Sequence, residues 1–106
     1  MVSQIDIYYD KLLSTFGGIN YKGAKLLATM MAYYSPDKAM KTIVREAAEI
    51  QNTTPTACER DVRTYINYLN KIKSIEELRA MLDYPFLYDK LVPTEFIPAL
   101  IRAFNK

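Results

Sequence analysis

Residues 52–69 have the sequence NTTPTACERDVRTYINYL, which places a polar break directly before a helical pattern with two distinct faces. Thr54 belongs to the residue types that cap helix N-termini, and Pro55 suits the first helical position because no backbone N–H is needed there. At about 100° per residue, one face is apolar and the other is polar. The apolar face holds Cys58, Val62, Tyr65 and Leu69, and the polar face holds Thr56, Arg60, Arg63 and Asn67, with Glu59 at its edge. The pattern predicts an amphipathic helix over about residues 55–70.

A second helical pattern lies just upstream, over about residues 40–51, and the polar break joins the two. Two helices joined by a tight turn, the second with an apolar back and an arginine-bearing front, are typical of a helix-turn-helix. We therefore expect a helix-turn-helix at about residues 39–70. An ordinary amphipathic helix with a solvated charged face would give the same pattern, so the pattern alone leaves both interpretations open.

Helical patterns separated by turn residues account for the rest of the chain, with no strand pattern and no internal repeat. The Ser-Pro-Asp sequence at 35–37 favours the start of the third helix, in which Ile50 belongs to the apolar side. Ser74 and Glu77 have the spacing of a capping box. Thr94 is expected to cap the last helix, and residues 86–92 are expected to form a packed loop. The expected helices cover about residues 3–15, 21–34, 36–50, 55–70, 75–82 and 95–104. The sequence therefore predicts an all-α fold, a single compact domain of about six helices over residues 1–106.

The composition is that of an ordinary globular domain with a mild positive charge. The chain has 106 residues, of which 50% are hydrophobic and 25% are charged, and its formal net charge is +2. A chain of this length suggests one domain with one modest core. Because the composition is not strongly basic, a nucleic-acid interface would have to come from local clustering of charge.

Residues suited to catalysis or metal binding are scarce. The chain has no histidine, one cysteine and three glycines. Histidine is the commonest general base and metal ligand, and a zinc site needs several histidines or cysteines. No glycine-rich phosphate loop is present. We therefore expect no enzymatic activity, no metal, no cofactor and no small-molecule substrate, and we expect Cys58 to be a buried structural thiol.

The sequence also contains no targeting signal. The first residues, MVSQIDIYYD, lack the basic and apolar regions of a signal peptide. No apolar run approaches the ~20 residues of a membrane span. A single cysteine fits a reducing compartment. These features predict a cytoplasmic protein without a membrane partner.

The central motif is similar to a known recognition helix. The Asn-Thr-Thr break, followed by Pro-Thr, Glu-Arg and a further arginine, resembles the C-terminal DNA-binding domain of the sporulation initiation regulator, the stage-zero protein A family. The matching residues are Asn52, Thr53, Thr54, Glu59, Arg60, Arg63 and Ile66. Residues 21–23 resemble that domain's Ile-Lys-Gly, and residues 93–97 resemble its Pro-Thr and Glu-Phe-Ile. The resemblance covers about residues 19–104, although this chain is a few residues shorter around 35–37 and again after Thr94.

The resemblance implies a transcriptional regulator that binds double-stranded DNA, with a homodimer on DNA as one arrangement. The helix at about 55–70 would enter the major groove, where Arg60 and Arg63 would contact guanine edges or phosphates. Further contacts to bases, sugars or phosphates would come from Thr53, Thr54, Thr56, Glu59, Asn67 and Lys71. The two threonines would contact phosphates through their hydroxyls and backbone N–H groups. Flanking phosphate contacts would come from Lys71 and Lys73, with Lys38, Lys41 or Lys22. The family's N-terminal receiver domain has no counterpart before residue 19, so we do not expect its phosphorylation control here.

One position departs from the family motif. The family usually has an arginine two residues before the glutamate of its Glu-Arg pair, and this chain has Ala57. An arginine can donate to O6 and N7 of one guanine, whereas alanine offers only a methyl group. The substitution predicts weaker binding to the family's usual target, or a preference for an altered one.

A second function fits the same sequence: a helical protein-interaction module that kept the fold and lost DNA binding. Glu59 and Asp61 lie on or near the polar face and offset the charges of Arg60 and Arg63, which weakens attraction to phosphates. The chain also has nine tyrosines, whose rings with polar tips suit protein interfaces. The sequence leaves both functions open.

Overall fold

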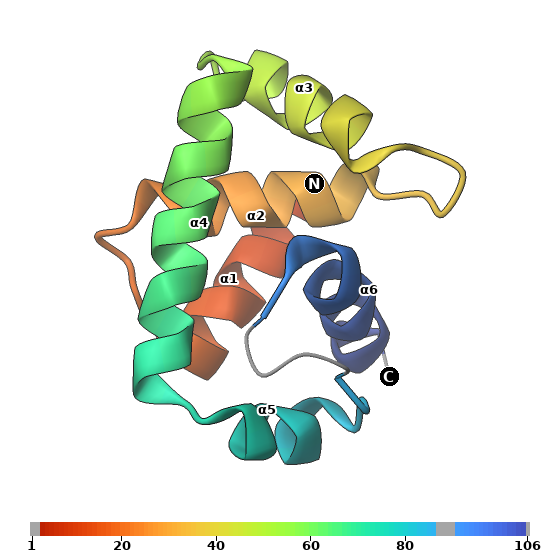
Figure 1. Cartoon of the computed structure of the whole chain (residues 1–106). Coiled ribbons are helices and arrows are strands. Elements are labelled where there is room, and N and C mark those ends of the chain that lie inside the picture. The colour runs from red at the N-terminus through yellow and green to blue at the C-terminus, as the bar shows by residue number, and fades with distance from the viewer. Residues whose placement is uncertain (1–2, 87–90, 106) are drawn as a thin grey trace.

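Six α-helices make up most of the computed structural model, which describes residues 3–86 and 91–105 (Figure 1). The helices are α1 (Gln4–Phe16), α2 (Lys22–Tyr33), α3 (Met40–Ile50), α4 (Pro55–Ile72), α5 (Ile75–Leu82) and α6 (Pro93–Phe104). Neither described range contains a strand. The radius of gyration is 12.8 Å, close to the ~13 Å of a compact domain of this length. The expected all-α, single-domain fold is confirmed.

Helix α2 occupies the centre of the molecule. It packs against α1, α3, α4 and α6, and in Figure 1 α4 crosses it on one side. Its sequence is apolar on nearly every side, and such a helix is stable only when other elements surround it. Even Thr29 is buried, and its hydroxyl donates to the Lys25 carbonyl at 2.8 Å. Helix α2 is therefore the support against which α3 and α4 are placed.

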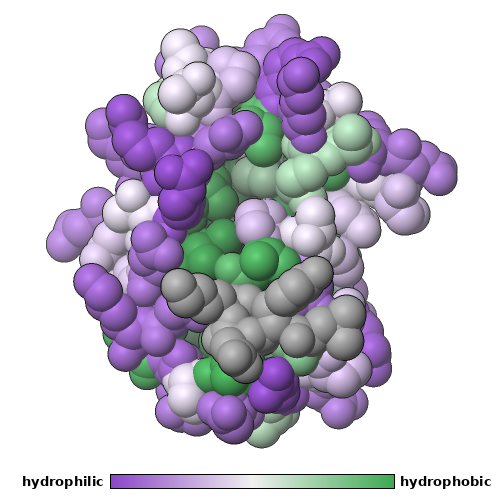
Figure 2. Space-filling view, viewed as in Figure 1, coloured by the Kyte–Doolittle hydropathy of each residue, from purple (hydrophilic) through white to green (hydrophobic). Residues whose placement is uncertain are grey.

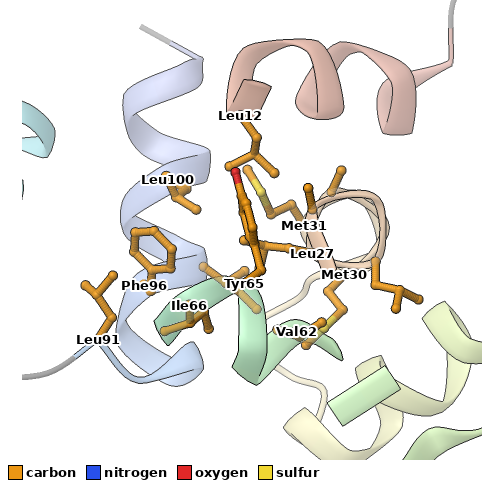
Figure 3. Close-up of a cluster of buried hydrophobic side chains, with 14 of the residues drawn as sticks. Leu12, Leu27, Met30, Met31, Val62, Tyr65, Ile66, Leu91, Phe96 and Leu100 are labelled. Carbon is orange, nitrogen blue, oxygen red and sulfur yellow. The ribbon is translucent and has the colours of Figure 1, made fainter. Parts of the chain in front are cut away.

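The inner face of α4 enters the core between α2 and α6 (Figure 3). The four residues assigned to its apolar face are all buried, and Ile66 is buried with them. Tyr65 is fully buried, and its hydroxyl donates to the Gly17 carbonyl at 3.0 Å. This bond satisfies the polar end of a side chain that otherwise contacts apolar groups. Burial also raises the pKa of Tyr65.

The third helix begins later than expected. Residues 35–37 form a turn in which the Asp37 N–H donates to Ser35 Oγ at 3.3 Å and the Lys38 N–H donates to the Ser35 carbonyl at 3.1 Å. Helix α3 begins only at Met40. A serine side chain that bonds a neighbouring amide offers the backbone an alternative to the helix. The start expected at the Ser-Pro-Asp sequence was therefore wrong, whereas the helical pattern over about residues 40–51 gave the start correctly.

Two further details differ from the sequence prediction. Ile50 is 42% exposed, because it is the last residue of α3 and the chain turns away there. Helix α6 begins at Pro93, with Val92 as its N-cap, so Thr94 lies inside the first turn and is not the cap. Proline's fixed φ suits the first helical position, which explains why the helix starts at Pro93, two residues earlier than expected.

The other local predictions are confirmed where the structure describes them. Ser74 and Glu77 form the reciprocal hydrogen bonds of a capping box at the start of α5. Within the packed loop expected over 86–92, Phe86 and Leu91 are buried. Residues 87–90 of that loop lie outside the described residues.

Candidate nucleic-acid interface

A short turn, residues 51–54, connects α3 to α4 and is held by backbone hydrogen bonds. The Thr53 N–H donates to the Ala48 carbonyl at 2.9 Å, and the Asn52 N–H donates to the Glu49 carbonyl at 3.3 Å. Asn52 has a φ of 55°, a left-handed conformation that asparagine tolerates better than most residues. This is the Schellman arrangement that ends many helices. Local chemistry therefore sets the direction in which the chain leaves α3.

Both ends of the turn are anchored by side chains. Gln51 Nε2 donates to Thr29 Oγ1 at 3.0 Å, which ties the turn to α2. Thr54 caps α4, because its Oγ1 accepts from the Ala57 N–H at 3.1 Å, and Pro55 occupies the first helical position as expected. The start of α4 is thus held relative to both α2 and α3.

The two threonines of the turn are partly engaged by these bonds. The Thr53 N–H is bonded to Ala48, so the expectation that this N–H contacts a phosphate was wrong. Thr54 uses its hydroxyl oxygen as the helix cap. Each hydroxyl retains a proton that can donate to a phosphate oxygen, so a phosphate contact from Thr53 has to come from its side chain.

The outer side of α4 presents a strip of exposed polar residues, which we call the recognition face. Its members are Thr56, Arg60, Arg63, Asn67 and Lys71, all exposed. At about 100° per residue they fall within about 80° of one another, and at about 1.5 Å per residue the strip is about 22 Å long. It lies on the opposite side of α4 from the buried Tyr65 and Leu69. The structure thus brings together five of the predicted contact residues.

The charge on the recognition face is uneven. Arg60 Nε lies 3.3 Å from Asp61 Oδ1, and the Asp61 side chain is only 21% exposed. Asp61 lies on the flank of α4 that faces α2, so it partly neutralises Arg60 without occupying the exposed strip. Among the described residues, no ion pair or hydrogen bond engages the Arg63 side chain. Glu59 is exposed at the edge of the recognition face opposite to the flank that holds Asp61.

A groove with a volume of about 510 Å³ runs beside the recognition face. We call it the apolar groove, and its floor is visible in the middle of Figure 2. The floor consists of Met30, Met40, Val44, Val62, Ile66 and Leu91, and the rim carries Lys41, Glu59, Arg63 and Asn67. The sequence predicted Glu59, Arg63 and Asn67 of the rim as DNA contacts, and Lys41 as one of the possible flanking phosphate contacts. It did not predict the groove, because the floor is assembled from α2, α3, α4 and the residue Leu91 ahead of α6.

A more polar pocket of about 430 Å³ lies on the other flank of α4, between the start of α2 and the turn. We call it the basic pocket, and its lining includes Lys22, Lys25, Asn52, Thr53 and Arg60. Lys25 Nζ lies 3.1 Å from Asp6 Oδ1, and this hydrogen bond lowers the pKa of Asp6. The structure therefore places Lys22, an expected flanking phosphate contact, beside Arg60.

The other expected flanking lysines separate into two groups. Lys38 Nζ lies 3.0 Å from Glu46 Oε1, and Lys73 Nζ lies 3.9 Å from Glu77 Oε2, so both charges already have acidic neighbours. Lys41 and Lys71 are exposed. These two are the better placed for contacts with phosphates.

Cys58 lies on the inner side of α4 and is fully buried. Burial raises the pKa of its thiol to about 11, with smaller contributions from the charges of Asp61 and Glu59. A buried, protonated thiol is a poor nucleophile and a poor metal ligand. Within residues 3–86 and 91–105, no group of three or more histidine, cysteine, aspartate or glutamate side chains is placed to hold a metal ion.

Alkaline pH is expected to destabilise the fold through Cys58. The thiol has an ordinary pKa of 9.0 and a pKa of about 11 in the folded chain. Between these values the unfolded chain loses the thiol proton first, so stability is full below about pH 9 and falls as the pH approaches about 11. Urea unfolding at about pH 8 and about pH 10.5 measures the fall. Cys58→Ala should show a smaller fall, the remainder coming from the raised pKa of Tyr65, and an equal fall in both proteins would contradict the prediction.

Comparison with known proteins finds no matching family model, no similar curated protein and no similar solved structure. None of the helices in the described part of the chain is long and apolar enough to cross a bilayer.

Proposed function

We propose that this chain is a DNA-binding transcriptional regulator related to the sporulation initiation regulator, with α3, the turn and α4 acting as a helix-turn-helix. The observation that carries the proposal is the recognition face. Arg60 and Arg63 of the motif lie there with Thr56 and Asn67, on one exposed strip of a helix whose other side is core. A recognition helix needs this division, because one side must be held rigidly while the other enters the major groove.

Each residue has a role in this proposal. Arg60 and Arg63 contact guanine edges or phosphates, and Arg63 is the more available because Arg60 is paired with Asp61. Thr56 and Asn67 each contact a base edge or a sugar. The Glu59 carboxylate can accept a hydrogen bond from the amino group of a cytosine. Lys71 lies at the far end of α4, where a recognition helix leaves the groove, and it contacts a phosphate.

The alternative function, a protein-interaction module, is favoured by one observation. The two arginines of α4 are accompanied by two acids, and one arginine is already paired with one of them. Electrostatic attraction to DNA is therefore weak, and a surface of this kind tolerates a protein partner as well as a duplex.

Binding-site selection from genomic DNA, followed by gel-shift titration at low and moderate salt, tests the proposal. We expect selection of a defined sequence and an affinity that falls with rising salt, since phosphate contacts release counterions. The stoichiometry on the selected site shows whether a homodimer binds. Failure to retain any DNA at low salt would overturn the proposal and favour the interaction module.

Replacing Arg60 or Arg63 with alanine is expected to weaken binding to the selected DNA by about 1–3 kcal/mol where the arginine contacts a base. Both side chains are exposed, so thermal melting should be nearly unchanged. Arg102→Ala is the matched control, since Arg102 is an exposed arginine near the C-terminal end of α6. Equal affinities for the control and both variants would argue against the recognition face.

Ala57 provides a test of specificity. It lies in the first turn of α4, the part of a recognition helix that enters the groove most deeply. Ala57→Arg is expected to shift preference toward the target sequence of the resembled family, by about 1–3 kcal/mol at the guanine that the new arginine contacts. Competition binding against that sequence and variants at each guanine measures the shift. Tight, selective binding of the unchanged chain to the family's target would refute the idea.

A further inference from the structure

The apolar groove has the size and lining of a small-molecule site. Its volume of about 510 Å³ lies within the ~300–1,000 Å³ typical of ligand pockets. Figure 2 shows apolar side chains at the bottom of a hollow in the middle of this face. Two of the floor residues are Met30 and Met40, whose flexible, polarisable side chains adapt to ligands of varied shape. The groove can therefore take an apolar group from solution.

The rim of the groove is positively charged. Lys41 comes from α3 and Arg63 from α4, so each of the two helices that border this part of the groove supplies a cation. Neither side chain takes part in an ion pair or hydrogen bond with another described residue. Among the described residues that line the groove, Glu59 is the only acid, and Asn67 adds a neutral amide. Two unpaired cations beside an apolar floor complement a molecule with an apolar body and an anionic head.

We propose that the apolar groove binds an anionic amphiphile, a carboxylate carrying an alkyl chain. The chain lies on the floor formed by Met30, Val44 and Ile66, and the carboxylate is held at the rim by Lys41 and Arg63. Arginine can bind a carboxylate through two parallel hydrogen bonds, while lysine contributes a point charge.

Binding at this site has a consequence for DNA. Arg63 and Asn67 belong both to the rim of the groove and to the recognition face. A carboxylate on Arg63 therefore competes with DNA for the same guanidinium, and the amphiphile acts as a negative effector. This consequence rests on the proposed function, whereas binding of the amphiphile does not.

The binding test uses decanoate as the probe and 1-decanol as its uncharged counterpart, both added to the whole chain below their aggregation limits. Methyl resonances are followed by NMR, and the heat of binding by calorimetry. We expect saturable binding of decanoate with one molecule per chain, with shifts concentrated at Met30, Val44, Val62 and Ile66. Decanol should bind more weakly. Absence of saturable shifts at these methyls would overturn the proposal. This is also the result expected if the groove binds a helix of another protein and not an amphiphile.

Two variants separate the anionic head from the apolar body. Lys41→Gln and Arg63→Gln should each weaken decanoate binding by about two- to fivefold, as expected for an exposed charge pair, and leave decanol binding unchanged. Arg102→Gln is the matched control and should bind decanoate like the unchanged chain. Met40→Trp should fill the groove and reduce binding of both probes, provided that circular dichroism shows an unchanged fold. Equal effects of Arg63→Gln on decanoate and decanol would exclude a carboxylate site at the rim.

The effect on DNA is measured separately, by adding decanoate to gel-shift reactions with the selected sequence. We expect decanoate to release DNA from the unchanged chain and to have less effect on Met40→Trp. Equal release of DNA from the unchanged chain and from Met40→Trp would overturn the proposal that decanoate competes with DNA at the groove. If the chain binds no DNA, the proposed function fails, and the methyl shifts alone decide whether the amphiphile site exists.

Discussion

Replacing Gly23 with alanine is expected to lower the free energy of unfolding by about 3 kcal/mol, the upper part of the range for overpacked sites. A Cβ atom at Gly23 would lie 2.0 Å from the Asp61 carbonyl oxygen, 2.7 Å from its carbonyl carbon and 2.8 Å from Tyr65 Cβ. Two of these are backbone atoms of α4, which cannot swing aside as a flexible side chain could. Helices α2 and α4 would therefore have to move apart and loosen the packing around Tyr65.

The sign of this change makes the test decisive. At an unobstructed helical position, alanine in place of glycine raises stability by about 0.5–1 kcal/mol. Urea denaturation followed by circular dichroism distinguishes the two outcomes, and a stability that was unchanged or raised would show that the helices do not approach this closely. Because the shift would also displace the recognition face, Gly23→Ala should weaken DNA binding without altering any residue of that face.

Leu69→Asp is expected to lower the free energy of unfolding by about 3–5 kcal/mol, the range for leaving a charge buried without a partner. Leu69 is fully buried on the inner face of α4. A carboxylate at this position would lose its hydration without gaining a cation or a set of hydrogen bonds. The loss should shrink as the pH is lowered, because the protonated acid is less costly to bury than the ionised one.

Thr64→Asp is the matched control for this prediction. It introduces the same residue into the same helix, at an exposed position. Surface substitutions usually change stability by no more than about 0.5 kcal/mol, so the two variants should differ by several kcal/mol in thermal or urea unfolding. Similar losses in both would contradict the difference in burial between the two positions, and a larger loss in Thr64→Asp would mean that the inner and outer faces of α4 have been assigned the wrong way round.

The sequence was most informative about α4 and its cap. The spacing of Cys58, Val62, Tyr65 and Leu69 correctly identified the buried side, because the period of a helix relates residues three and four apart whatever surrounds them. The cap by Thr54 was also predictable, because its Oγ1 accepts from the N–H of Ala57, only three residues further along the chain. Where two local preferences competed, as in the turn at 35–37 ahead of α3, the prediction failed.

The candidate site was predictable only in part, because some of its features depend on local spacing and others do not. The strip from Thr56 to Asn67 follows from the helical period alone, since these residues lie on one helix. Lys71 joins the strip because α4 continues to Ile72, beyond the end expected at about residue 70. The engagement of the Thr53 N–H depended on how α3 ends, and the pairing of Arg60 with its neighbour Asp61 depended on side-chain conformations that a pattern does not specify.

The sequence by itself thus determined the presence of the six helices, the caps of α4 and α5, the buried side of α4 and most of the residues on its exposed strip, because these depend on contacts within about one or two helical turns. Only the tertiary structure decided the apolar groove and the basic pocket, whose walls come from separate helices. It also decided the contact of Gly23 with Asp61, which lie far apart in the chain. The packing of whole helices onto α2 determines which distant residues meet, and no local spacing carries that information.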